Sequence, residues 1–233
     1  MRNILGSNNF ETAVQDYFLL LNKSYPEQRS RLLVSDRYHL NKYQRTVLFR
    51  GVFSDPVNKA RRSRLTAIRR PDDDTLFVDL LNVLLLLMNY QYGRSVFRST
   101  DLLLRDVGEH FFKFDSRDYC LLALGALKES LGILGFPRVL LVADTEKSRQ
   151  YPKILQNPKK LIELLKPPGV SLEWEYSAST DKLLSQLSEG ILATSDSAVI
   201  DKSRLPLIDL PGHALNTFFQ ARPLDLYRLI YPD

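Results

Sequence analysis

Three short stretches of the chain are largely apolar and end in an aspartate. TLFVD covers 75–79, PRVLLVAD covers 137–144 and GILATSD covers 190–196. Apolar runs of this length are typical of strands that are buried in a sheet. Segments with helical spacing lie between them, and this alternation of strands and helices predicts an α/β domain with a parallel sheet that is covered by helices on both faces.

Other segments of the same region fit this sheet. VSLEWEYS at 170–177 alternates as an edge strand does, and LPLIDL at 205–210 predicts a last short strand. The intervening helices are expected over four ranges: 116–134, 147–165, 180–188 and 214–230.

The strand-end aspartates are expected to meet, because the carboxyl ends of parallel strands lie at one edge of a sheet. These residues are Asp79, Asp144 and Asp196, and Asp181 belongs with them because it begins the helix after the 170–177 strand. Asp101 and Asp106 lie in the long first crossover, so they are possible additional acids at the same edge.

Clustered carboxylates repel one another unless a cation neutralises them. Their oxygen ligands favour Mg²⁺ or Mn²⁺ over zinc, and such ions can hold a phosphodiester and activate a water molecule. Asn82, one helical turn beyond Asp79, can orient the phosphate or the nucleophile. We therefore predict a catalytic group of Asp79, Asn82, Asp181 and Asp196, and a metal site formed by Asp79, Asp144, Asp181 and Asp196.

Each aspartate also has a simpler explanation as a helix cap or a first-turn acid. A cap accounts well for Asp144 and a first-turn acid for Asp181. Asp79 lies within the apolar stretch FVDLLNVLLLLM, where no helix start is obvious, and Asp196 in ATSDSAVI is similar. Asp79 and Asp196 are therefore the main predicted ligands.

The charge of the chain is uneven along its length. Residues 1–71 hold 14 Lys and Arg against 5 Asp and Glu, whereas residues 72–233 hold 18 against 22. The PDDD stretch at 71–74 breaks the helical pattern, so we place a domain boundary after residue 71. Three short helices are expected within 10–53, which predicts a small all-α module before the α/β domain.

A basic segment that precedes an acidic domain favours contact with a polyanion, although a solvated basic surface would look the same. The predicted nucleic-acid-binding residues lie in the segment KARRSRLTAIRR: Arg61, Arg62, Arg64, Arg69 and Arg70.

Several other classes of protein are excluded. The single cysteine, Cys120, rules out a disulfide within the chain and fits a reducing compartment. No secretory signal is evident, and the longest apolar run is too short to span a bilayer, so a cytoplasmic protein without membrane contact is expected. Neither a glycine-rich phosphate loop nor zinc-ligand spacing is present.

The segment VDLLNVLLLLMNYQYGRSVFRSTDLLLRD resembles the opening of PIN-like (NYN/PIN) domains, and ATSDSAVID is similar to the late Thr-x-Asp motif of that superfamily. The N-terminal helices resemble the domain-of-unknown-function family 434, which precedes such domains in uncharacterised prokaryotic proteins. The resemblance implies a Rossmann-like sheet and metal-dependent hydrolysis of the ribonuclease type. It assigns Asp79, Asn82 and Asp196 to the motif positions and Asp181 to the acid before the last core strand, whereas Asp101, Asp106 and Asp144 match less closely.

One departure concerns the Gly-Tyr of the motif, which is Leu80–Leu81 in this chain. A glycine would let substrate or metal approach the backbone, and a leucine fills that space. Two functions therefore stay open. The first is a Mg²⁺- or Mn²⁺-dependent endonuclease that prefers RNA to DNA. The second is a non-catalytic nucleic-acid-binding regulator, and a homodimer or a protein inhibitor would be a further partner.

Overall fold

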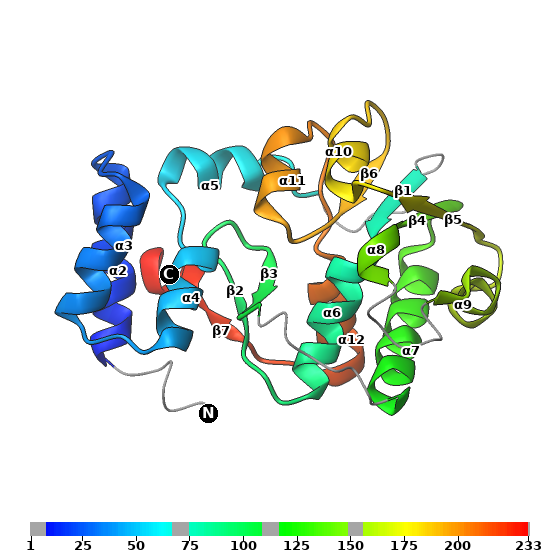
Figure 1. The fold of residues 1–233 in the computed structure, drawn as a ribbon, viewed down its shortest axis with the longest axis horizontal. Helices are drawn as coiled ribbons and strands as arrows, with labels where there is room; N and C mark the ends of the chain where they lie inside the picture. The colour runs from blue at the N-terminus through cyan, green and yellow to red at the C-terminus, as the bar shows by residue number, and fades with distance from the viewer. Residues whose placement is uncertain (1–7, 67–74, 109–116, 149–155, 233) are drawn as a thin grey trace. The chain divides into compact units, whose positions relative to one another are not determined.

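The computed structural model describes residues 8–66, 75–108, 117–148 and 156–232 (Figure 1). The chain folds into two compact units. The first comprises Met1–Ser63, Gly93–His110 and Arg222–Asp233, and the second comprises Arg64–Tyr92 and Phe111–Ala221. This division differs from the expected boundary after residue 71, because two later segments join the N-terminal helices.

The second unit contains a parallel sheet of four strands in the order β5-β4-β1-β6. The central pairings align Asp79 of β1 with Val142 of β4, and Val78 of β1 with Ala193 of β6. The strands are β1 (Thr75–Asp79), β4 (Arg138–Asp144), β5 (Ser171–Ser177) and β6 (Ile191–Ala193). β6 and the second half of β1 are fully buried, as strands covered on both faces require.

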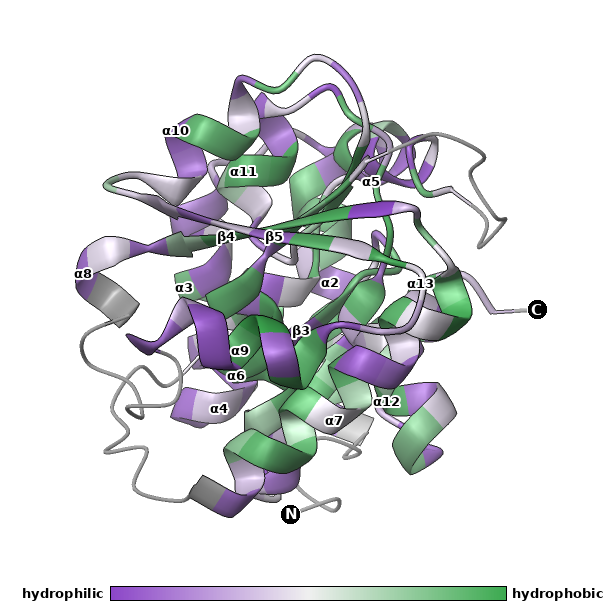
Figure 2. Ribbon diagram, turned by 90° about the vertical axis from the view of Figure 1, so that its right-hand side faces the viewer, coloured by the Kyte–Doolittle hydropathy of each residue, from purple (hydrophilic) through white to green (hydrophobic). Residues whose placement is uncertain are grey.

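Helices cover both faces of this sheet, as the sequence predicts. On one side of the sheet lie α6 (Leu80–Gln91), α7 (Arg117–Leu134), α9 (Pro158–Leu165) and α12 (Leu210–Phe219) (Figure 2). Figure 2 shows α10 (Thr180–Ser185) and α11 (Ser197–Lys202) on the opposite side of β4 and β5. The short α8 (Thr145–Ser148) directly follows β4. None of the helices in the described ranges is long and apolar enough to cross a membrane.

The end of the chain differs from the prediction in two places. The expected strand at 205–210 is reduced to isolated bridges from Leu207 to Leu192 and Leu65. The expected helix at 214–230 is two helices, because α12 ends before Gln220, whose φ of 47° is left-handed, and Pro223 follows. β7 (Leu224–Asp225) and α13 (Leu226–Ile230) then return the chain to the first unit.

The first unit begins with helices, as predicted. They are α2 (Asn8–Asn22), α3 (Glu27–Arg37), α4 (Lys42–Gly51) and α5 (Asp55–Arg62). Asn41 caps α4 by accepting a hydrogen bond from the Gln44 amide, and the Gln44 side chain accepts one from the Asn41 amide. This reciprocal pair is a capping box, which satisfies two amides that the helix itself leaves unpaired.

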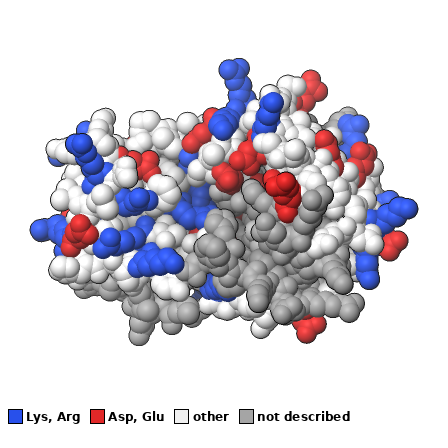
Figure 3. Space-filling view, viewed as in Figure 1, with Lys and Arg blue, Asp and Glu red and all other residues white. Residues whose placement is uncertain are grey.

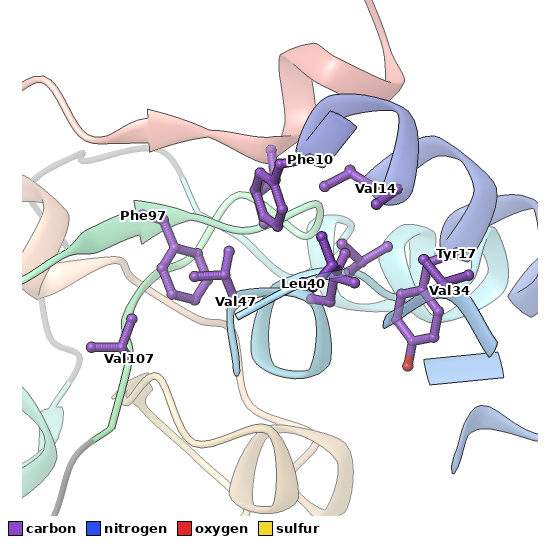
Figure 4. Close-up of a cluster of buried hydrophobic side chains, with 12 residues drawn as sticks. Phe10, Val14, Tyr17, Val34, Leu40, Val47, Phe97 and Val107 are labelled. Atoms are coloured by element: carbon purple, nitrogen blue, oxygen red, sulfur yellow. The ribbon is translucent and has the colours of Figure 1, made fainter. Parts of the chain in front are cut away.

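The N-terminal segment forms helices, as predicted, but the first unit as a whole is not all-α because two later segments add strands. It contains a small sheet in the order β3-β2-β7, built from β2 (Val96–Arg98), β3 (Leu104–Asp106) and β7. Phe97, Val107 and Leu226 pack into one apolar cluster with buried residues of α2 and α4 (Figure 4). A few short helices bury too little apolar surface to be stable alone, so these segments complete the core.

This core predicts the effect of one substitution. Phe97→Ala removes a ring that is fully buried in the cluster and should lower the free energy of unfolding by about 3–5 kcal/mol. Phe218→Ala is the matched control, because that ring is 47% exposed and its loss should change stability by no more than about 0.5 kcal/mol. Urea denaturation of the full chain measures both variants, and equal shifts would contradict this description of the core.

Candidate carboxylate site

The chain order of the strands locates the candidate site. From β1 the chain builds outward through β4 to β5, and then returns to place β6 on the other side of β1. The order in which strands are added therefore reverses between β1 and β6, although the two strands are parallel. In open parallel sheets, such a point forms a crevice at the carboxyl edge. Asp79 is the last residue of β1, and Thr194 directly follows β6.

Asp79 faces the end of β6. The residue is 7% exposed, and its Oδ2 accepts a hydrogen bond of 2.9 Å from Thr194 Oγ1. Helix α6 begins at Leu80, so the expectation that no helix starts near Asp79 is wrong. Asp79 occupies the N-cap position of α6, but within the described chain its side chain makes no capping hydrogen bond.

Two further hydrogen bonds connect the start of α6 to the segment after β6. Asn82 Oδ1 accepts a bond of 2.8 Å from the Ser195 amide, and Thr194 Oγ1 accepts one of 3.1 Å from the Asp196 amide. Thr194 therefore contacts both predicted main ligands. Asn82, predicted to orient a phosphate, instead holds the backbone that follows β6.

Burial raises the pKa of Asp79 to about 7, and it is the largest influence on this group. The Thr194 hydroxyl and the Asn82 backbone lower the pKa, whereas the negative charges of Asp196 and Asp181 raise it. Asp196 lies close to Asp79, because the Thr194 side chain hydrogen-bonds with both residues. The convergence of Asp79, Asp181 and Asp196 in one metal site stays a prediction.

Asp196 also has a structural role. It is the N-cap of α11, and its Oδ1 accepts a hydrogen bond of 2.7 Å from the Ala198 amide. The expectation that a cap explains Asp196 poorly is therefore wrong. Its charge still acts on Asp79, so the residue both caps a helix and contributes to the acidic edge.

Asp181 and Asp144 lie at the same edge of the sheet. Asp181 is in the first turn of α10, whose N-cap is Ser179, and it is half-buried. Asp144 ends β4, and its Oδ1 accepts a hydrogen bond of 3.0 Å from the Glu146 amide at the start of α8. Figure 3 shows acidic side chains gathered over the region of α8 and α11.

Two buried hydroxyl groups at this edge were not predicted from the sequence. Ser195 is 3% exposed and Thr180 is 5% exposed, and neither side-chain oxygen has a hydrogen-bond partner among the described residues. Ser195 lies between Thr194 and Asp196, and Thr180 precedes Asp181. Their positions next to predicted acids were the available signal, but small hydroxyl residues are too common near turns to be singled out from sequence.

Asp101 and Asp106 belong to the first unit, whereas Asp79, Asp144, Asp181 and Asp196 belong to the second. Asp101 is fully buried, and its oxygens accept hydrogen bonds from Arg105 at 2.6 and 2.8 Å and from Arg61 at 2.9 Å. The two guanidinium groups and the Ser99 hydroxyl lower the pKa of Asp101 to about 2 against the opposing effect of burial. Asp106 pairs with Arg50 at 3.5 Å.

The predicted nucleic-acid-binding arginines are mostly engaged within the fold. Arg61 pairs with Asp101 and stacks on Phe53, and Arg62 lies 4.8 Å from the centre of the Tyr231 ring. Arg64 donates hydrogen bonds to the backbone oxygens of Ser203 at 2.6 Å and Ile200 at 2.9 Å. Arg69 and Arg70 lie outside the described residues.

The acidic edge is not a closed metal cage. Within the described ranges, no group of three or more His, Cys, Asp or Glu side chains is arranged so that it could hold a metal ion. Leu80 and Leu81, which replace the Gly-Tyr of the PIN-like motif, are both buried in the first turn of α6. What the edge offers is a buried carboxylate, two neighbouring charges and several neutral oxygens.

Comparison with known proteins gives a family but no activity. Residues 9–64 match the family described as "Protein of unknown function (DUF434)", which confirms the predicted N-terminal module. An uncharacterized protein of Methanocaldococcus jannaschii is 26% identical over 208 residues, which cover 89% of this chain and 97% of that protein. No solved structure matches this chain.

A second family covers the region that forms the acidic edge. Residues 68–213 match the family described as "Domain of unknown function (DUF5616)". Neither matching description names a nuclease or a PIN-like domain, so that resemblance stays a prediction. Because the second match covers more than half of the chain, the protein belongs to the DUF5616 family.

Proposed function

We propose that the second unit is a divalent-metal-dependent phosphodiester hydrolase that acts on RNA. The main support for this proposal is the environment of the Asp79 carboxylate. The carboxylate is buried beside the charges of Asp181 and Asp196, and no cation of the described residues pairs with it. A buried carboxylate in this environment strongly favours a bound cation.

Among the described residues Asp79, Asp101 and Asp106 are buried, and the contrast between Asp79 and Asp101 is plain. Asp101 is neutralised by Arg61 and Arg105, and its pKa falls to about 2. Asp79 has only neutral hydrogen-bond partners, and its pKa rises to about 7. The fold therefore compensates the first charge internally and leaves the second uncompensated, which is typical of a functional site.

The residues at this edge fit Mg²⁺ or Mn²⁺. Such ions are commonly held by one or two carboxylates, with water and substrate phosphate as the other ligands, so a cage of three acids is not required. Asp79 and Asp196 would hold the ion, with Asp181 and Asp144 contributing directly or through water. When bound, the ion would polarise a phosphodiester and lower the pKa of a water molecule.

The remaining residues of the site have positioning roles. Thr194 fixes the orientation of the Asp79 carboxylate and of the Asp196 backbone. Asn82 fixes the Ser195 backbone, and the Ser195 and Thr180 hydroxyls lie buried near these residues without a hydrogen-bond partner among the described residues. The strand order and the places of Asp79 and Asp196 also support assigning the unit to the PIN-like, Rossmann-like folds.

A non-catalytic nucleic-acid-binding role is the second candidate. It is favoured by Leu80 and Leu81, which differ from the PIN-like motif, and by the internal hydrogen bonds that already engage Asn82 and Asp196. This role predicts binding without turnover, so a cleavage assay separates the two functions.

The first prediction from the site concerns cleavage. The full chain should cut single-stranded RNA in Mn²⁺ and not in EDTA, and Asp196→Asn should slow cleavage by at least about a hundredfold, since changes even to outer-sphere partners of a metal cost up to that much. Asp209→Asn is the matched control, because Asp209 caps α12 as Asp196 caps α11, and asparagine preserves a cap. Cleavage in EDTA, or cleavage that survives Asp196→Asn, would contradict the proposal.

The second prediction concerns stability and pH. The pKa of Asp79 rises from 3.8 to about 7 on folding, so the folded chain retains a proton that the unfolded chain loses between these values. The contribution of Asp79 to the free energy of unfolding therefore falls as pH rises through this window. As pH rises from about 4 to about 8, the free energy of unfolding of Asp79→Asn should therefore increase relative to that of the wild type.

Urea denaturation in EDTA at several pH values measures this difference. Added Mn²⁺ should oppose the effect, because it binds the deprotonated carboxylate and so stabilises the wild type more at high pH. If the free energies of unfolding of the wild type and of Asp79→Asn differed by the same amount at every pH, Asp79 would have an ordinary pKa.

A further inference from the structure

Helix α4 in the first unit exposes a surface that is both basic and aromatic. The helix contains Lys42, Arg45 and Arg50 and has no acidic residue. Its buried side carries Gln44, Val47, Leu48 and Gly51. Tyr43 and Phe49 are on the solvent side, and each is 45% exposed.

Helix α3 extends this surface. The Arg31 guanidinium lies 4.5 Å from the centre of the Phe49 ring, so it stacks on the ring and connects the two helices. Leu32 is 49% exposed in the next position of α3. Figure 3 shows Lys and Arg side chains on the face over α3 and α4. We call Arg31, Lys42, Tyr43, Arg45 and Phe49 the α3–α4 face.

We propose that the α3–α4 face binds single-stranded RNA by stacking unpaired bases on Phe49 and Tyr43 while its cations contact the phosphates. Proteins that hold single strands combine these two features, exposed aromatic rings and a positively charged track. The inference rests on the proposed function for the choice of RNA. It moves the contact away from the 61–70 segment, where Arg61 and Arg64 are already engaged in the fold.

The chemistry of the face distinguishes this ligand from two others. A duplex hides the faces of its bases, so exposed rings would contribute little to holding it. A second copy of the chain would bring the Arg31, Lys42 and Arg45 of this face toward the same cations of its partner, and like charges oppose that contact. Arg45 is held on this face by a hydrogen bond of 2.8 Å from its Nε to the Leu40 backbone oxygen and by an exposed ion pair with Asp36 at 3.3 Å, and the ion pair is weak.

The test measures binding without cleavage. Fluorescence anisotropy follows a labelled oligouridylate of about 16 nucleotides with the full chain in EDTA. Phe49→Ala should raise Kd by about 5- to 100-fold, the range expected for loss of one stacked base, whereas Phe49→Tyr should bind nearly as the wild type does. Phe218→Ala, which removes an equally exposed ring from the second unit, should leave Kd unchanged.

Salt dependence tests the basic component separately. Lys42→Ala should reduce the slope of log K against log salt by about 0.7, the value for one phosphate contact with a single strand. Lys159→Ala is the control, because Lys159 is exposed on α9 in the second unit and should not change the slope.

Three results would overturn the inference: an unchanged Kd for Phe49→Ala, tighter binding of a duplex than of the single strand, or a dimer that Phe49→Ala dissociates while RNA binding is unaffected. Its failure is separable from that of the hydrolase. If Mn²⁺-dependent cleavage occurs and Phe49→Ala still binds normally, only the α3–α4 face is refuted. If Phe49→Ala weakens binding but the chain never cleaves, only the hydrolase is refuted.

Discussion

The hydrogen bond from Thr194 Oγ1 to Asp79 Oδ2 joins two segments that are 115 residues apart in the chain. It forms because β1 and β6 are parallel neighbours, so that the ends of both strands reach the same edge of the sheet. The same threonine accepts the Asp196 amide, and Asn82 accepts the Ser195 amide. The pairing of β1 with β6 thus sets the geometry of the whole acidic edge.

This geometry buries the Asp79 carboxylate without a cationic side chain to neutralise it. Desolvation and the neighbouring charges of Asp181 and Asp196 together favour the protonated form of Asp79 near neutral pH. Asp101 is equally buried but is paired with two arginines, so the fold is able to compensate such a charge. The difference between these two sites is the physical basis for assigning a function to one and a structural role to the other.

The sequence predicted the parts of the molecule that depend on local pattern. The buried strands and the helices between them follow from apolar spacing. The prediction failed where distant segments meet. Nothing local to Phe97 or Leu226 indicates that they complete the core of the N-terminal helices. Asp101 and Asp79 likewise look alike in sequence, because the partner Arg61 lies 40 residues away from Asp101.

The central claim is that the edge formed by Asp79 and Asp196 binds a divalent metal. A crystal of the protein grown in Mn²⁺ tests it most directly, since manganese scatters anomalously and its position is identified without assumption. We expect an anomalous peak coordinated by both carboxylates. A well-ordered edge without a peak, with Asp79 hydrogen-bonded only to Thr194, would contradict it.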